Sequence, residues 1–176
     1  MPAPPTQHTY ATAEVVTAAN LNTHPQGITW QLRNKPQMLA RQVSATTSIP
    51  NNAWTIVKMD TVDIDTETGY STSTGKYTCK VAGWHYITAN IVFAANSTGD
   101  RGVHIVTSFG NITGVELAPA SNLNTGLNFA VMIRLNIGDT VWCEAIQTSG
   151  AALSTSTNYA SGRAEASFLD IMYLRF

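Results

Sequence analysis

The apolar positions of residues 84–93 fall on both sides of a predicted β-strand. Side chains of a strand alternate between the two faces of its sheet, and a strand buried on only one side keeps its other face polar. Here one face carries His85, Ile87, Ala89, Ile91 and Phe93, and the other carries Trp84, Tyr86, Thr88, Asn90 and Val92. The pattern predicts a central strand, covered on one face by a second sheet, with a partner chain as the candidate cover of the other.

The chain from residue 37 onward repeats strand-length apolar segments between clusters of Gly, Asn, Ser and Thr. The clearest alternation runs over residues 127–135. Further strands are predicted at residues 39–45, 54–60, 77–81, 102–109, 141–147 and 164–176, with a short edge piece at 115–118 and a loop at 61–75. Together they predict an all-β sandwich of about 8–10 antiparallel strands.

Residues 1–36 do not fit the strand pattern and form a predicted N-terminal arm. Thr17 can cap a short helix that runs to about His24, and residues 28–32 then form one more turn or an extended segment. The arm has too few apolar residues for them to bury one another. We therefore expect these residues to pack against another chain or another protein. The candidate docking residues are Val15, Val16, Leu21, Ile28, Trp30 and Leu32.

Composition narrows the classes of partner. Charged residues make up 12% of the chain and the net charge is -1, whereas nucleic-acid binding needs clustered Lys and Arg. The chain has no apolar run of the length that spans a membrane, and its first residues lack the basic and apolar regions of a secretory signal. The sequence therefore predicts neither nucleic-acid binding nor membrane insertion, and an ordinary export signal would not account for a location outside the cell.

The sequence predicts no catalytic, cofactor-binding or metal-binding residue, and a protein that is not an enzyme. Cys79 and Cys143 fall within strand patterns, where small buried hydrophobic side chains are favoured over a disulfide. The histidines do not have metal-ligand spacing, and no Ser or Cys sits in a nucleophile elbow. Folding could bring together a glycosidase-like pair of carboxylates, but nothing selects one from Asp100, Glu116, Glu144, Glu165 and Asp170.

One acidic stretch, residues 60–69, carries Asp60, Asp63, Asp65 and Glu67. Oxygen ligands at alternate positions could hold calcium. Counted from Asp63, however, the stretch lacks both the Gly and the final Glu of a helix-flanked calcium loop. A solvated acidic loop is the favoured interpretation, and a cation site is the alternative.

Three polar loops are candidates for recognising a host-surface glycan. They cover residues 96–101, 122–125 and 148–158 and are rich in Asn, Ser and Thr, whose side chains donate and accept hydrogen bonds. The alternative is that they only connect strands.

A first resemblance lies in the arm. Residues 13–24, Ala-Glu-Val-Val-Thr-Ala-Ala-Asn-Leu-Asn-Thr-His, are similar to a segment near the N-termini of virion proteins encoded by bacteriophages of actinobacteria. The segment departs from that pattern at Pro25, where a helix would normally continue.

A second resemblance covers about residues 39–176. In order along the chain, Gly75-Lys-Tyr77, Gly83-Trp-His-Tyr86 and Gly138-Asp-Thr-Val141 resemble motifs of the jelly-roll head domain of complement component 1q and the tumour necrosis factors. Ala166-Ser-Phe168, with Ile171 and Met172, resembles their closing strand. Two positions depart from the family pattern: Met59-Asp60 stands where the family has Phe-Asp, and Tyr86 comes one residue after the position of the family's tyrosine. These departures affect the predicted local register of the strands, not the predicted fold.

The second resemblance implies a jelly-roll head domain at residues 37–176 and a compact homotrimer packed on strand faces. The candidate trimer contacts are Trp84, Tyr86, Tyr173 and Phe176. With the first resemblance, it implies a virion structural protein (fibre, capsid decoration or tail protein), made in the host cytoplasm and displayed on the particle for host attachment or particle stabilisation. The alternatives are a secreted bacterial or host trimeric binding module and, less favoured, a glycan-processing enzyme.

Overall fold

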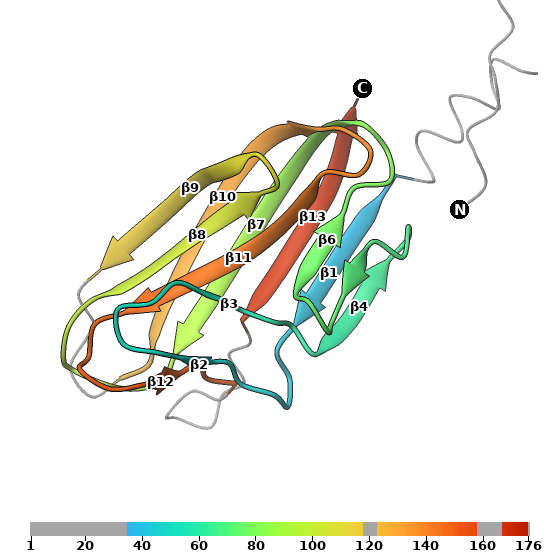
Figure 1. Ribbon diagram of the computed structural model, residues 1–176. Coiled ribbons are helices and arrows are strands. Elements are labelled where there is room, and N and C mark those ends of the chain that lie inside the picture. The colour runs from blue at the N-terminus through green and yellow to red at the C-terminus, as the bar shows by residue number, and fades with distance from the viewer. Residues whose placement is uncertain (1–34, 118–122, 158–166, 176) are drawn as a thin grey trace, which may run out of the picture.

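The computed structural model describes residues 35–117, 123–157 and 167–175, which form two stacked antiparallel β-sheets (Figure 1). The first sheet is ordered β10 (Thr125–Leu135), β7 (Gly83–Phe93), β13 (Phe168–Arg175), β1 (Gln37–Arg41) and β4 (Thr61–Asp65). The second sheet is ordered β5 (Tyr70–Ser71), β6 (Lys76–Thr78), β11 (Thr140–Gln147), β8 (Arg101–Thr107) and β9 (Gly110–Leu117), with β3 (Thr55–Ile56) also paired to β11. A small third sheet pairs β12 (Leu153–Ser154) with β2 (Ser48–Ile49).

This architecture confirms the predicted all-β jelly-roll sandwich. The predicted helix at residues 17–24 lies outside the described residues. The described part of the chain contains no helix that could cross a membrane.

Strand β7 lies inside the first sheet, as its pattern predicted. It pairs with β10 along its whole length and with β13 on its other side. Its inward side chains, from His85 to Phe93 at every second position, have no exposed surface, whereas Trp84, Tyr86, Thr88 and Asn90 on the other face are partly exposed. The first sheet therefore has one covered face and one face that the described part of the chain leaves largely open, with Val92 buried at its end.

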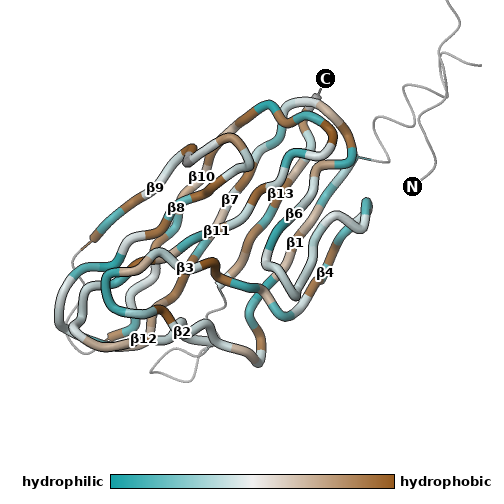
Figure 2. Tube along the Cα trace, viewed as in Figure 1, coloured by the Kyte–Doolittle hydropathy of each residue, from teal (hydrophilic) through white to brown (hydrophobic). Residues whose placement is uncertain are grey.

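The core lies between the two sheets and is almost entirely apolar. Its side chains come from β1, β7, β10 and β13 of the first sheet and from β6, β8 and β11 of the second. Figure 2 shows the same hydrophobic recurrence as brown positions along these strands and mostly pale or teal loops.

The two cysteines belong to this core. Cys79 and Cys143 are free thiols with no exposed surface, which confirms their predicted role as small buried hydrophobic residues. Burial raises the pKa of Cys79 to about 11 and that of Cys143 to about 12. Because the thiolate is the reactive form, both side chains stay inert at neutral pH.

The sequence prediction was wrong at the sheet edges. Residues 61–75, predicted as a loop, contain the strands β4 and β5, and the edge piece predicted at 115–118 is the end of the eight-residue strand β9. Conversely, only Thr55–Ile56 of the predicted strand 54–60 is in a ladder. An edge strand such as β4 leaves most of its side chains exposed, so it lacks the apolar alternation by which strands are recognised.

Candidate functional site

The candidate site is the outer face of the first sheet, opposite the core. Its central row is set by the ladder register, which places Met132 of β10 beside Tyr86 of β7, and Tyr86 beside Met172 of β13. The exposed fraction is 55% for Met132 and 37% for Tyr86. Side chains paired directly across antiparallel strands touch one another, so these three residues form a continuous apolar strip over three strands.

A second row runs beside this strip toward the sheet edge. It joins Thr88, Asp170, Leu39 and Ile64 across β7, β13, β1 and β4. A shallow cavity of about 180 Å³ opens between the last three strands, lined by Leu39, Ile64, Asp170 and the neighbouring Met172. Ile64 is 43% exposed, so the apolar surface extends to the edge of the sheet.

Asp170 is the acidic side chain within this row. Burial raises the pKa of its carboxyl group, although a hydrogen bond with the Thr88 side chain opposes the shift. A partner that covered this face would remove more water from Asp170 and further disfavour its charged form.

The structure separates the residues predicted as trimer contacts. Trp84 and Tyr86 lie on the outer face. Tyr173 is only 7% exposed and points into the sandwich, where its ring packs edge-on against His85 with the ring centroids 5.4 Å apart. Phe176 and all six predicted docking residues lie outside the described residues.

The reason for the position of Tyr173 is the register of β13. Tyr173 pairs with His85, and Met172 pairs with Tyr86, so the paired residues share a face and Met172 takes the outer position. His85 has no exposed surface; burial lowers its pKa, and its Nδ1 atom lies 3.0 Å from the carbonyl oxygen of Gly83. It is a core residue.

The carboxylate of Asp60 ties a loop to the sandwich. It accepts hydrogen bonds from the backbone N–H groups of Val43, Ser44 and Ala45 at 2.7, 2.9 and 3.0 Å, and from the Ser44 hydroxyl at 2.6 Å. Partial burial pushes the pKa of Asp60 upward, but these donors outweigh it and hold the pKa well below its ordinary value.

The other aspartates of the acidic stretch also have protein partners. Asp63 accepts hydrogen bonds from the Nε and Nη2 atoms of Arg41. Asp65 accepts from the backbone N–H groups of Gly69 at 3.1 Å and Tyr70 at 2.8 Å. The described residues contain no group of three or more His, Cys, Asp or Glu that could hold a metal. The stretch is an ordered edge strand and turn, and among its carboxylates Asp65 stabilises the turn.

The three polar loops lie at one end of the sandwich, opposite the end where the C-terminal strand finishes (Figure 1). Hydrogen bonds between Asp100 and Thr148 join loop 96–101 to loop 148–158. The Asp100 N–H donates to the Thr148 hydroxyl at 2.8 Å, and the Thr148 N–H donates to the Asp100 carbonyl at 3.2 Å. The Asn124 amide donates to the Ser156 hydroxyl at 3.1 Å and joins loop 122–125 to loop 148–158. The structure therefore brings the described parts of all three loops together.

Arg101 shapes the first of these loops from inside. Its guanidinium has no exposed surface and donates to the backbone carbonyls of Asn96, Thr98 and Asp100 at 2.9–3.0 Å. Burial lowers the pKa of Arg101, and Asp100 partly offsets the shift. Arg101 is not predicted from the sequence, because a buried arginine that binds only backbone carbonyls leaves no sequence pattern.

Two stacked antiparallel sheets, one with an apolar strip on its outer face, define a jelly-roll module. The family model of the C1q domain matches residues 40–162, and the chain belongs to this family.

Solved structures agree with this fold at low sequence identity. The globular domain of zebrafish complement 1qA is 15% identical with a TM-score of 0.61, covering 81% of this chain and 100% of the zebrafish chain. Murine APRIL at pH 5.0 is 12% identical with a TM-score of 0.60, covering 80% of this chain and 99% of its own. Eiger TNF from S. frugiperda is 11% identical with a TM-score of 0.57, covering 81% and 94% respectively.

Proposed function

We propose that this chain forms a homotrimer through the outer face of the first sheet, and that the trimer is a structural protein displayed on a bacteriophage particle. The main support for a trimer is the apolar strip of Met132, Tyr86 and Met172, which the described part of the chain leaves uncovered. Aromatic residues and methionine are enriched at protein interfaces, and an exposed apolar patch on a soluble domain marks an interaction site. Membership of the C1q family supports threefold association, as the sequence resemblance implied.

The place where the described domain begins supports display on a particle. Residue 35 lies beside the end of β13, where the backbone N–H of Tyr173 donates to the carbonyl of Pro36 at 2.9 Å. The three polar loops lie at the opposite end (Figure 1). An arm that docks on the virion would therefore leave the loops outermost, and many trimers per particle would turn weak contacts with a host surface into firm attachment.

The virion role is also supported by residues 13–24, which resemble a segment of actinobacteriophage virion proteins. Fibre, capsid decoration and tail protein all fit this arrangement. A trimeric binding module without a virion role is the second candidate, because the C1q family match covers the head domain and not the arm. Neither candidate requires catalysis.

The test of the virion role is mass spectrometry and electron microscopy of particles purified from infected host cells. The protein is expected in the particles, and Trp30→Asp in the arm is expected to remove it from them while the purified variant stays trimeric. Particles that lack the wild-type protein would contradict the virion role and favour the binding module.

The trimer should be sensitive to pH through Asp170. Burial raises the pKa of this carboxyl group in the single subunit, and association would raise it further, so the protonated form is favoured in the trimer. Association should strengthen as the pH falls through the raised pKa and weaken as the pH rises above it.

Asp170→Asn should strengthen association at pH 7 by about tenfold and remove this response, as measured by analytical ultracentrifugation between about pH 4 and 7. Weaker association of the variant would mean that the carboxylate pairs with a cation of the neighbouring subunit.

A further inference from the structure

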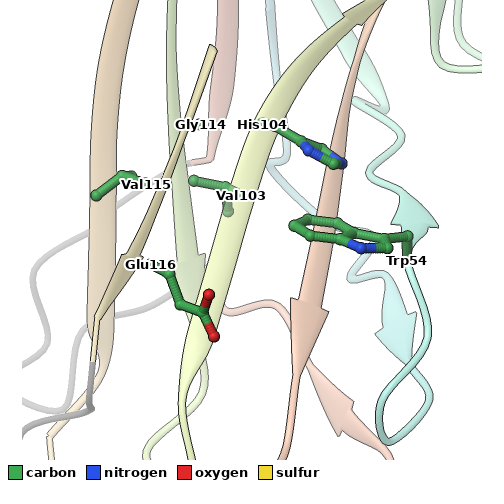
Figure 3. A pocket seen from close by; sticks show the side chains of 6 residues that line it. All are labelled: Trp54, Val103, His104, Gly114, Val115 and Glu116. Carbon is green, nitrogen blue, oxygen red and sulfur yellow. The ribbon is translucent and has the colours of Figure 1, made fainter. Parts of the chain in front are cut away.

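A second surface, on the outer side of the second sheet, has a hollow beside an exposed tryptophan. The hollow of about 270 Å³ is lined by Trp54, Val103, His104, Gly114, Val115 and Glu116 (Figure 3). It exists because Gly114 has no side chain: a Cβ atom there would stand 2.9 Å from the Cβ of His104. This Trp54 hollow is separate from the outer face of the first sheet and from the polar loops.

The indole of Trp54 is held in place although 47% of the residue is exposed. Its ring stacks on His104 with the ring centroids 3.6 Å apart and an angle of 21° between the planes. His104 is fixed in turn by Glu144, whose Oε2 atom lies 3.4 Å from the imidazole Nε2, and whose Oε1 atom accepts a hydrogen bond from the Trp142 indole at 2.8 Å. The exposed indole is therefore a pre-oriented surface.

The charges around the hollow are negative. Glu116 is exposed and has no hydrogen-bond or ion-pair partner in the part of the chain that the structure describes, and Figure 3 shows its carboxylate on the side of the hollow that faces Trp54. Burial lowers the pKa of His104, against the opposing effect of Glu144, so the imidazole does not balance these carboxylates at neutral pH. Glu116 is thus an unpaired anion beside an aromatic ring.

The same sheet face already holds one cation on an indole. The ammonium of Lys76 lies 3.7 Å from the centre of the Trp142 ring. Cations bind the faces of aromatic rings because the ring quadrupole is negative there, and tryptophan is the strongest such partner. In the described structure Trp54 has the aromatic ring and a nearby carboxylate, but no such cation.

We propose that the Trp54 hollow binds a lysine or arginine side chain of a partner protein, held by the Trp54 indole and the Glu116 carboxylate. A ligand rich in hydroxyl groups needs donors as well as acceptors. The imidazole Nε2 faces Glu144, and Figure 3 shows the indole nitrogen of Trp54 on the side away from Glu116. The free polar group of the hollow is thus an acceptor, and its matching ligand is a donor with positive charge.

The hollow fits a side chain better than a free small molecule. Small-molecule sites enclose most of their ligand, whereas this hollow is shallow and open. It adjoins β9, which ends the second sheet and pairs only with β8 among the described strands. An extended partner segment could follow this edge and contact Leu117, which is 51% exposed at the end of β9.

The site is complete within one subunit, so its test does not depend on the oligomeric state or on a virion role. The full-length protein, labelled with ¹⁵N, is titrated with N-acetyl-lysine methylamide and N-acetyl-arginine methylamide while the indole N–H resonance of Trp54 is followed by NMR. The resonance is assigned by its loss in Trp54→Phe. The neutral norleucine analogue controls for hydrophobic contact, and Asp100→Asn, which changes the charge by the same amount at another exposed site, is the matched control for Glu116→Gln.

The proposal predicts that millimolar concentrations of the cationic compounds shift the Trp54 indole resonance in a saturable way. The affinity of Glu116→Gln for these compounds should be at least about threefold lower than that of the wild type. The affinity of Asp100→Asn should stay within twofold of the wild type. Added salt should weaken binding, since the carboxylate is exposed. Equal shifts with the norleucine analogue, unchanged affinity of Glu116→Gln, or tighter binding of neutral monosaccharides would overturn it.

Discussion

Tyr86→Asp is expected to dissociate the trimer. Tyr86 stands at the centre of the apolar strip, between Met132 and Met172, so a carboxylate there would be buried without a partner on association. Such a charge costs about 3–5 kcal/mol, which corresponds to a loss of affinity of more than about a hundredfold. Sedimentation velocity over a range of protein concentrations would measure the change.

Ile137→Asp provides the matched control. Ile137 is 70% exposed in the turn between β10 and β11, so the same change of charge and polarity there should leave the trimer intact. Met132→Asp, on the same strip as Tyr86, should reproduce the effect of Tyr86→Asp. Both interface variants should keep the circular dichroism of the wild type, because the outer face does not contribute to the core. Equal association of all three variants would show that another surface forms the interface.

Arg101→Ala is expected to lower the free energy of unfolding by about 2–4 kcal/mol. The substitution removes three charge-assisted hydrogen bonds to the carbonyls of Asn96, Thr98 and Asp100. It also leaves a cavity where a fully buried side chain stood near the ring of Phe93. Urea unfolding, followed by tryptophan fluorescence, would measure the change.

The comparison variant is Lys80→Ala, which removes an exposed cationic side chain from the connection between β6 and β7. It should change the unfolding free energy by less than about 0.5 kcal/mol. Arg101→Ala should also speed hydrogen exchange at residues 96–100. If the two variants unfold at the same urea concentration, the buried guanidinium does not stabilise the loop.

The interior strands could be predicted because each has a fully covered face. In β7 and β11 one face of the strand is apolar at nearly every position, and the structure places that face in the core. Edge strands could not be predicted in the same way. In β4, Asp63 pairs with Arg41 and Asp65 supports the following turn, so the carboxylates that suggested a solvated loop belong to the strand and its turn.

The candidate surfaces were only partly visible in the sequence. Trp84 and Tyr86 were found because both faces of their strand are apolar. Met172 was missed because its neighbour Tyr173 is the larger aromatic residue, and only the pairing of β13 with β7 determines which of the two faces outward. The stack of Trp54 on His104 joins residues far apart in the sequence, so no local spacing reveals it.

The native mass of the full-length protein tests the central claim most directly. Light scattering coupled to size-exclusion chromatography at micromolar concentration should give three times the subunit mass of 18.9 kDa, with no detectable monomer. A stable species of 18.9 kDa under these conditions would contradict the claim that the outer face of the first sheet is an interface between copies of this chain.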